Sequence, residues 1–104
     1  MPVSIKTTTT TERIQLNTEA RPAFVYLLRC GDDSLYCGWT YDPPRRLAAH
    51  AAGRGARYTR GRGPFEFAAL FEFPDECSAR SEEVRIKTLP RKEKLALISA
   101  ADPG

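Results

Sequence analysis

Hydrophobic and aromatic residues concentrate in three short runs that indicate β-strands. The first run covers residues 24–30 and is bounded by Pro22 and Gly31. Runs rich in branched and aromatic residues that end at proline or glycine are typical of buried strands. A second run at 35–40 and a third at 65–73 have the same character. In the third run the aromatic residues alternate with other residues, as on one face of a strand: Phe65, Phe67, Phe71 and Phe73.

A helix is predicted directly after the second run. Asp42 supplies a carboxylate able to cap the helix, and two prolines with preset φ follow it. The helix should extend through Ala51 and stop at Gly53, because glycine is favoured just past a helix end.

Two more helices are predicted after the third run. Asp75 or Ser78 can cap a helix over about 76–88, and Pro90 opens another that extends to about residue 100. The pattern therefore predicts an α/β fold, with a three-stranded antiparallel sheet flanked by about three helices. With 104 residues there is room for a single compact domain, which we place at 23–100.

The turn between the first two strands decides how two tyrosines are arranged. If Gly31 pairs with Leu35 across a three-residue turn, Tyr26 and Tyr36 project from the same face of the sheet. In that register Tyr26 lies opposite Thr40. A four-residue turn would place the two phenols on opposite faces, because side chains alternate along a strand. Considered by spacing alone, both tyrosines fit an interpretation as half-buried packing residues.

The remaining composition narrows the class of protein. Residues 1–22 include a run of threonines and few large apolar side chains, so we expect a disordered tail. The chain has no apolar run of the length that spans a bilayer, so no membrane association is expected. Cys30, Cys37 and Cys77 form no C-x-x-C pair, which favours a reducing cytoplasm over a disulfide framework. A zinc site from Cys30, Cys37 and His50 would match no common ligand spacing.

Positive charge is concentrated in one segment of the chain. Six arginines and no acidic residue occur between Pro43 and Pro64. Such a block predicts a phosphate-facing surface, and the alternative is a solvated basic loop. The candidate nucleic-acid-binding residues are Arg45, Arg54, Arg57, Tyr58, Arg60 and Arg62.

Three helical residues are candidates for chemistry. Arg46 and His50 are spaced i, i+4 and project from one side of a helix, where they could bind phosphate and move a proton. An exposed amphipathic helix would also carry such a pair. Glu83 falls on the apolar stripe of its helix, where a carboxylate needs a cation, a metal or hydrogen-bond donors. The alternative partner is a nearby basic residue such as Arg80 or Lys87.

Together these residues resemble the GIY-YIG nuclease family, in particular its compact, stand-alone bacterial branch. Phe24-Val25-Tyr26 and, ten residues on, Tyr36-Cys37-Gly38 resemble the two short strand motifs that name the family. Arg46 and His50 follow as in the family's helix, and the segment from Ala79 to Lys87 resembles its metal-binding helix. The chain departs from the family pattern at Phe24, at Trp39 and in having no asparagine after Glu83.

The resemblance implies a role for each candidate. Tyr36 would assist or act as the general base toward the attacking water, and Tyr26 would line the same pocket. Arg46 would bind the scissile phosphate, with His50 as a phosphate or proton-transfer partner. Glu83 would anchor a divalent metal, Mg²⁺ or Mn²⁺.

The expected function is metal-dependent hydrolysis of DNA by an endonuclease, in repair, recombination or single-strand processing. One alternative is a binding module without catalysis, in which the arginines and Tyr58 hold a single strand. Another is a nuclease subunit that is active only with a protein partner.

Overall fold

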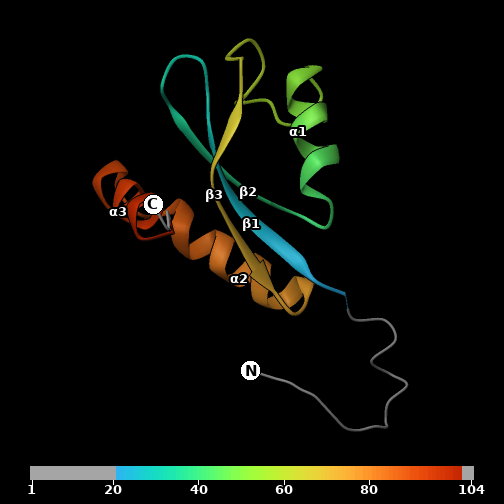
Figure 1. The fold of residues 1–104 in the computed structure, drawn as a ribbon, viewed down its shortest axis with the longest axis vertical. Helices are drawn as coiled ribbons and strands as arrows, with labels where there is room; N and C mark the ends of the chain where they lie inside the picture. Colours follow the sequence, from blue (N-terminus) through green and yellow to red (C-terminus); the bar gives the residue numbers. More distant parts are fainter. Residues whose placement is uncertain (1–20, 102–104) are drawn as a thin grey trace, which may run out of the picture.

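The structure is a computed structural model that describes residues 21–101. Its elements are β1 (Ala23–Arg29), β2 (Leu35–Thr40), α1 (Pro43–Ala51), β3 (Glu66–Phe73), α2 (Glu76–Lys87) and α3 (Arg91–Ala101) (Figure 1). The strands form one antiparallel sheet in the order β2-β1-β3. The predicted fold class is therefore confirmed. The predicted tail falls on residues that, except for Arg21 and Pro22, lie outside the described part of the chain.

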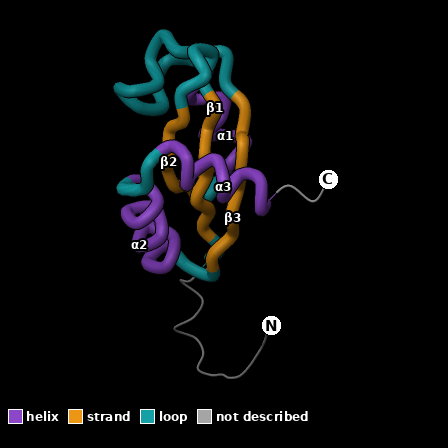
Figure 2. Tube along the Cα trace, turned by 90° about the vertical axis from the view of Figure 1, so that its left-hand side faces the viewer, coloured by secondary structure: helices purple, strands orange, loops and turns teal. Residues whose placement is uncertain are grey.

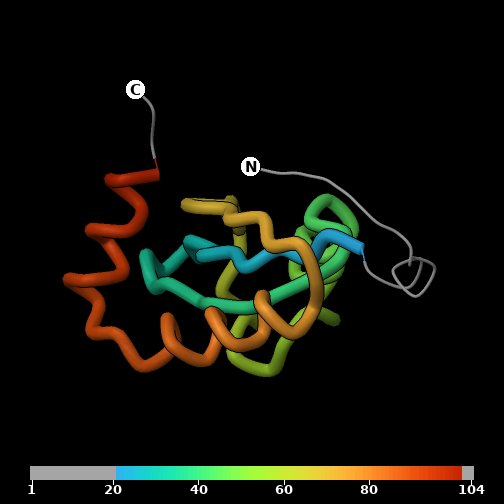
Figure 3. Tube along the Cα trace, turned by 90° about the horizontal axis from the view of Figure 1, so that it is seen from below, coloured from blue at the N-terminus to red at the C-terminus, as the bar shows by residue number. Residues whose placement is uncertain are grey.

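The helices cover the two faces of the sheet differently. In Figures 1 and 2, α1 lies on one side of the strands and α3 crosses the other. Seen from below, α2 runs beside the sheet on the side away from α1 and leads into α3 (Figure 3). Within residues 21–101, no helix combines the length and apolar character that crossing a bilayer requires.

The helix starts follow from the capping residues. The Asp42 carboxylate accepts a hydrogen bond from the Arg45 backbone N–H, and the Asp75 carboxylate accepts one from that of Ser78. Each bond satisfies an N–H group that the first turn of a helix leaves without a partner. Asp75, rather than Ser78, is therefore the cap of α2.

The apolar core lies between the sheet and the pair α2 and α3. Its strand residues alternate along β1, as expected for one face of a sheet. The buried members are Ala23, Val25, Leu27, Cys37, Ala69, Ala79 and Ile86. The residues between them on β1 point to the opposite face, where the candidate site lies.

The hairpin of β1 and β2 has a three-residue turn, but its register differs from the expected one. The backbone N–H of Cys30 donates to Ser34 O at 2.9 Å, so the turn comprises residues 31–33. Asp33 has a φ of 69°, as is usual for the last residue of such a turn. Tyr26 therefore lies opposite Gly38 and not opposite Thr40. Because the pairing moved by a whole two-residue period, both tyrosines still share one face.

The alternation of the four phenylalanines in the third run suggested that they share one face of the sheet. In the structure they do not. Leu27 pairs with Ala69, but Leu28 pairs with Phe67, so residue 68 is an extra residue in β3. A β-bulge of this kind reverses the alternation of side chains beyond it. Phe71 and Phe73 consequently pack on the apolar core, whereas Phe67 contacts the ring of Tyr26.

Candidate active site

A buried chain of hydrogen bonds links β1, α1 and the loop of residues 53–63, which we call the basic loop. Tyr26 Oη lies 2.8 Å from Nε2 of His50, and Nδ1 of His50 lies 2.8 Å from Thr59 Oγ1. The Thr59 hydroxyl lies 3.0 Å from the carbonyl oxygen of Ala56. All three side chains in the chain are at most 2% exposed. His50 therefore has both ring nitrogens engaged inside the protein, and neither is open to a phosphate group.

Burial suppresses the charged forms of the two ring systems in this chain. Loss of solvation raises the pKa of the Tyr26 phenol well above its ordinary value, and the charge of Tyr36 adds to the rise while that of Arg46 opposes it. Burial also lowers the pKa of His50, and the positive charge of Arg46 lowers it further. His50 is thus neutral at neutral pH and is able to accept a proton.

Tyr36 lies at the outer side of this group. Its ring centroid is 6.3 Å from that of Tyr26 and 5.5 Å from that of His50. The exposed ring of Tyr58 stacks on Tyr36 with an interplanar angle of 24°. The basic loop therefore contributes an aromatic ring to the same cluster as the two strand tyrosines.

Glycine at position 38 leaves space for the Tyr26 phenol. A Cβ atom there would lie 2.5 Å from Tyr26 Oη and 3.1 Å from Cε2 of Tyr36. Any larger residue would collide with both rings. A glycine inside a strand often marks such a close approach, and here two side chains lie against the Gly38 backbone.

Arg46 borders the cluster from α1. It precedes His50 by one helical turn, and its guanidinium donates to the carbonyl oxygen of Gly55 at 3.4 Å. Its positive charge lowers the pKa of His50 and opposes the rise in the pKa of Tyr26. One long hydrogen bond leaves most of its donors available to an anion.

Glu83 approaches from α2. Its side chain is 15% exposed, and Oε2 lies 3.3 Å from Nζ of Lys87. That ammonium also lies 6.0 Å from the ring centroid of Tyr36. The charge of Glu83 also contributes to the raised pKa of Tyr26, after burial and the other charges. The carboxylate is thus both paired with a basic residue and close to the tyrosine cluster.

Cys37 holds α2 against the sheet at this point. Its thiol lies 3.9 Å from the backbone oxygen of Glu83. Burial, and after it the charge of Glu83, raises the pKa of the thiol to about 11. The thiol is therefore protonated and serves as a packing group beneath the Glu83 backbone.

Two of the candidate DNA-binding arginines line a hollow beside α1. Arg45 and Arg54, together with Arg46, border a cavity of about 400 Å³. Among the described residues, neither Arg45 nor Arg54 forms an ion pair. The hollow therefore has an excess of positive charge next to the tyrosine cluster.

The other basic-loop residues differ in their partners. Arg57 and Arg60 are exposed and form no ion pair within residues 21–101. Arg62 instead pairs with Asp32 at 2.5 Å, and its guanidinium lies 4.3 Å from the ring centroid of Tyr58. Part of the Arg62 charge is therefore already compensated inside the protein.

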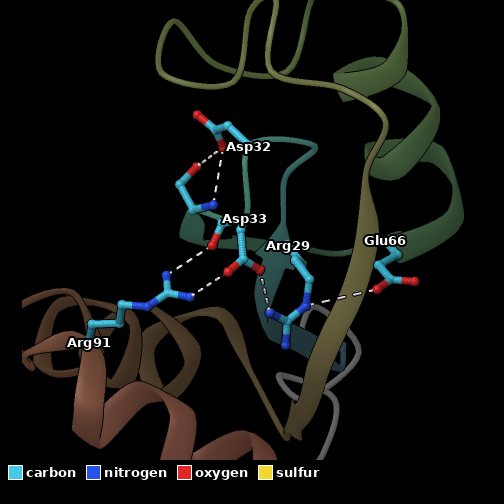
Figure 4. A network of polar contacts seen from close by, with 6 residues as sticks. Arg29, Asp32, Asp33, Glu66 and Arg91 are labelled. Carbon is cyan, nitrogen blue, oxygen red and sulfur yellow. Dashed lines mark hydrogen bonds and ion pairs between the residues drawn. The ribbon is translucent and has the colours of Figure 1, made fainter.

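The hairpin turn connects this loop to the rest of the fold. Asp33 accepts hydrogen bonds from Arg29 and Arg91, so the turn is tied to β1 and to the start of α3 (Figure 4). Hydrogen bonds from Ser34 and the neighbouring Arg62 guanidinium together lower the pKa of the Asp32 carboxyl to about 2. Asp32 remains ionised and able to hold Arg62 over a wide pH range.

Comparison with known proteins decides the family. The family model of the GIY-YIG catalytic domain matches residues 22–96, which is most of the 104-residue chain. The chain belongs to the GIY-YIG family. This is a family of nucleases, and the matched segment includes every strand and helix described above except the end of α3.

Close relatives share its small size. The UPF0213 protein of Oceanobacillus iheyensis is 55% identical over 75 residues, which are 72% of this chain and 87% of the relative. The UPF0213 protein of Nitratidesulfovibrio vulgaris is 53% identical over 76 residues, which are 73% of this chain and 69% of the relative. These matches support the compact, single-domain branch of the GIY-YIG family.

Solved structures of relatives have the same fold. The solution NMR structure of a UPF0213 protein from Bacillus halodurans is 44% identical, with a TM-score of 0.52, and the match covers 79% of this chain and 88% of that one. The solution NMR structure of a protein from E. faecalis is 34% identical, with a TM-score of 0.55, covering 77% and 85%.

The GIY-YIG family implies a divalent metal, and Glu83 is the one carboxylate near the tyrosine cluster that we assign to it. Glu83 is a half-buried carboxylate with one ionic partner among the described residues, and Mg²⁺ needs only one or two carboxylates because it retains several waters. Within the described residues, no cluster of three or more His, Cys, Asp or Glu side chains could hold a metal. A zinc site of Cys30, Cys37 and His50 is therefore not formed.

Several residues of this GIY-YIG site were absent from the sequence-based candidates. Thr59, Gly55 and Lys87 contact His50 or Glu83 directly, yet each belongs to a residue type that occurs throughout the chain. From the sequence alone, Lys87 is only an alternative partner for Glu83. Thr59 lies between an exposed tyrosine and an exposed arginine, and no periodic pattern marks it as buried.

Proposed function

We propose that this protein is a metal-dependent DNA endonuclease that hydrolyses phosphodiester bonds. The observation that carries the proposal is the hydrogen bond between Tyr26 and neutral His50 in a cluster bordered by Tyr36 and Arg46. Hydrolysis requires an acceptor for the proton of the attacking water and a positive charge beside the phosphate. The cluster has both.

Proton transfer is best explained by Tyr26 and His50 acting together. Alone, the Tyr26 phenol is a poor base, because burial raises its pKa and so opposes the phenolate. If water gives a proton to Tyr26 Oη while the phenolic proton moves to Nε2 of His50, no phenolate forms. The water oxygen bonds to phosphorus, and the leaving oxygen departs with the electron pair of the broken P–O bond. Tyr36 assists by orienting the water from the outer side of the cluster.

Arg46 supplies charge stabilisation in this proposal. Its guanidinium presents several N–H donors in a rigid, positively charged plane. The phosphate gains negative charge on its non-bridging oxygens as water adds, so a cation there stabilises the transition state more than the ground state.

Glu83 would hold the metal. Mg²⁺ or Mn²⁺ bound there would act as a Lewis acid toward the scissile phosphate. The Lys87 ammonium pairs with this carboxylate at 3.3 Å and lies 6.0 Å from the ring centroid of Tyr36. In this proposal Glu83 from α2 and Arg46 from α1 would act on the phosphate from two different helices.

The substrate in this proposal is DNA bound along the basic loop and the hollow beside α1. Exposed arginines that lack ion pairs can contact phosphates without reading bases, so cleavage would have low sequence specificity or depend on a partner protein. In this proposal the enzyme cleaves DNA in the cytoplasm during repair, recombination or single-strand processing.

Cleavage by the full chain tests the proposal. We expect Mg²⁺-dependent cutting of single-stranded, duplex or branched DNA that a chelator abolishes. Arg46→Ala should lower kcat by roughly 10²-fold or more, as for loss of a preorganised charge-stabilising donor. Cleavage that Arg46→Ala leaves unchanged would show that the activity comes from a different site or from a contaminant.

A catalytically silent binding module is the second candidate, and the exposed Tyr58 ring favours it. Tyr58 is 43% exposed beside Arg57 and Arg60, as in surfaces that stack bases of single strands. Tight binding of single strands by the full chain, without cleavage of any DNA structure at any Mg²⁺ or Mn²⁺ concentration, would support this candidate over the enzyme.

A further inference from the structure

The basic loop encloses His50 as well as carrying arginines. Thr59 is 1% exposed although its neighbours Tyr58 and Arg60 are exposed. A Cβ atom at Gly55 would lie 2.1 Å from Nδ1 of His50, so the loop backbone is packed directly against the imidazole. The one polar side chain that this loop directs inward is therefore in contact with a ring nitrogen of the site.

The hydrogen bonds of Thr59 indicate where its proton goes. A hydroxyl has one proton, and Thr59 Oγ1 lies 3.0 Å from the Ala56 carbonyl oxygen, which can only accept. If the proton is donated there, Oγ1 can take part in the 2.8 Å contact with His50 only as an acceptor. Nδ1 must then carry the imidazole proton.

The other end of the chain requires the same direction. Tyr26 is 2% exposed, and among the described residues Nε2 of His50 is the acceptor found for its hydroxyl. With the imidazole proton on Nδ1, Nε2 accepts from Tyr26 and every proton in the chain has a partner. The opposite arrangement would leave the buried Tyr26 hydrogen without a protein acceptor, which native structures rarely tolerate.

We infer that Thr59 is a positioning residue that keeps the His50 proton on Nδ1, so that Nε2 faces Tyr26 as a proton acceptor. The catalytic meaning of this arrangement rests on the proposed nuclease function, but the arrangement itself does not. Because Thr59 lies between Arg57 and Arg60 in the basic loop, the segment proposed to hold DNA also prepares the proton acceptor. Correct placement of the loop is then a condition for catalysis.

The chain has a single histidine, which makes the inference directly measurable. Long-range ¹H–¹⁵N correlation spectra of the ¹⁵N-labelled full chain report which imidazole nitrogen carries the proton. The groups that face His50 are Tyr26, Tyr36 and Arg46. The spectra are recorded at a pH at which the imidazole is neutral in these surroundings. We expect one tautomer, protonated at Nδ1. A parent spectrum with the proton on Nε2 would overturn the inference.

Two substitutions at the same position separate positioning from packing. Thr59→Val has a similar shape but no acceptor, and we expect a mixture of tautomers or the Nε2-protonated form. Thr59→Ser retains the hydroxyl and should keep the parent tautomer. An unchanged tautomer in a folded Thr59→Val protein would overturn the inference, and if that variant does not fold, loss of the parent tautomer in Thr59→Ser would do so.

Activity gives a second, separate readout. In serine proteases, loss of the residue that sets the histidine tautomer lowers kcat by about 10⁴-fold. Thr59 acts on the attacking water only through His50 and Tyr26, so we expect a smaller effect here. Thr59→Val should lower kcat by roughly 10- to 1,000-fold with little change in DNA affinity. Thr59→Ser should have a kcat close to that of the parent. If the spectra show control by Thr59 but no variant or parent cleaves DNA, the positioning role stands and the nuclease proposal fails.

Discussion

Gly38 lies directly against the phenol of Tyr26, on the neighbouring strand. The two residues are paired across the hairpin, and a Cβ atom at Gly38 would be 2.5 Å from Oη and 2.7 Å from Cζ of Tyr26. The phenol can occupy this position because residue 38 has no side chain. The glycine of the second strand motif therefore leaves the space in which Tyr26 can form its hydrogen bond to His50.

Gly38→Ala should displace Tyr26 and break its hydrogen bond to His50. We expect a loss of about 1–3 kcal/mol in the free energy of unfolding, the usual range for overpacking a well-filled site. Cleavage should fall by at least about 100-fold, because general acid–base catalysis commonly contributes that much. Denaturant unfolding and cleavage rates check the two effects. A Gly38→Ala protein with parental stability and activity would contradict the contact.

Glu83→Gln should abolish Mg²⁺-dependent cleavage while DNA affinity stays near that of the parent. The amide is similar in shape to the carboxylate but carries no charge for a divalent cation, which prefers anionic oxygen ligands. Cleavage rates at several Mg²⁺ concentrations and a separate binding assay measure the two properties.

The adjacent carboxylate offers a matched control. Glu82 pairs with Arg85 and is at the surface of α2, so Glu82→Gln makes the same chemical change without touching the tyrosine cluster. We expect parental cleavage from it. Equal activity in parent and Glu83→Gln would remove the metal-binding role from Glu83.

Replacing both Arg57 and Arg60 by alanine should weaken DNA binding and reduce its salt dependence. Each phosphate contact that is lost removes about one unit from the slope of log K against log salt concentration. Both arginines are exposed and have no ion pair within the described part of the chain, so their charge is available to phosphates. Titrations at several salt concentrations measure the slope.

Arg80→Ala is the control for this change in charge. Arg80 is exposed on α2, pairs with Glu76, and lies outside the basic loop. Its removal should leave the slope nearly unchanged. If the double variant of the basic loop retains the parental slope, the arginines are a solvated surface and not a DNA-binding one.

Stability should decrease when the pH falls below the ordinary pKa of histidine. Burial, and then the charge of Arg46, lowers the pKa of His50 below 6.5 in the folded state, so the unfolded chain takes up this proton first. The contribution of neutral His50 to the free energy of unfolding is complete above about pH 6.5. It is lost as the pH falls through the lowered pKa of His50 in the folded state. Glu76 and Glu82 have pKa values below 4.5, because of hydrogen bonds from Tyr41 and Arg85, so their contributions are lost only at lower pH.

His50→Gln provides the comparison for this pH dependence. Glutamine can donate and accept hydrogen bonds but does not titrate, so its unfolding free energy should change less than that of the parent between pH 6.5 and 4.5. Chemical denaturation at a series of pH values measures both proteins. Parallel curves would mean that another group, and not His50, controls stability in this range.

Much of the fold could be predicted from local patterns. The strand and helix positions, the cap at Asp42 and the shared face of Tyr26 and Tyr36 all follow from backbone geometry within a few residues. The expected partner of Tyr26 was two residues away from the observed Gly38, and a shift of two residues leaves both tyrosines on the same face. Arg46 and His50 lie on one side of α1 for the same kind of reason, a helical spacing of four.

Other features depend on contacts between distant segments. The bulge in β3 separates Phe67 from Phe71, and nothing in their alternation announces an extra residue between them. Within residues 21–101, Cys30, Cys37 and His50 do not come together as a metal-binding group, which only the tertiary structure shows.

The amino-acid sequence alone determined the elements, their order and the residue types available for catalysis, because periodicity and capping are properties of neighbouring residues. The tertiary structure decided which of these side chains meet. Thr59 reaches His50 only because the basic loop closes over α1, and Glu83 reaches the tyrosine cluster only because α2 packs beside β2. Contacts of this kind depend on how loops close and strands pair across the whole domain, which short-range patterns do not encode.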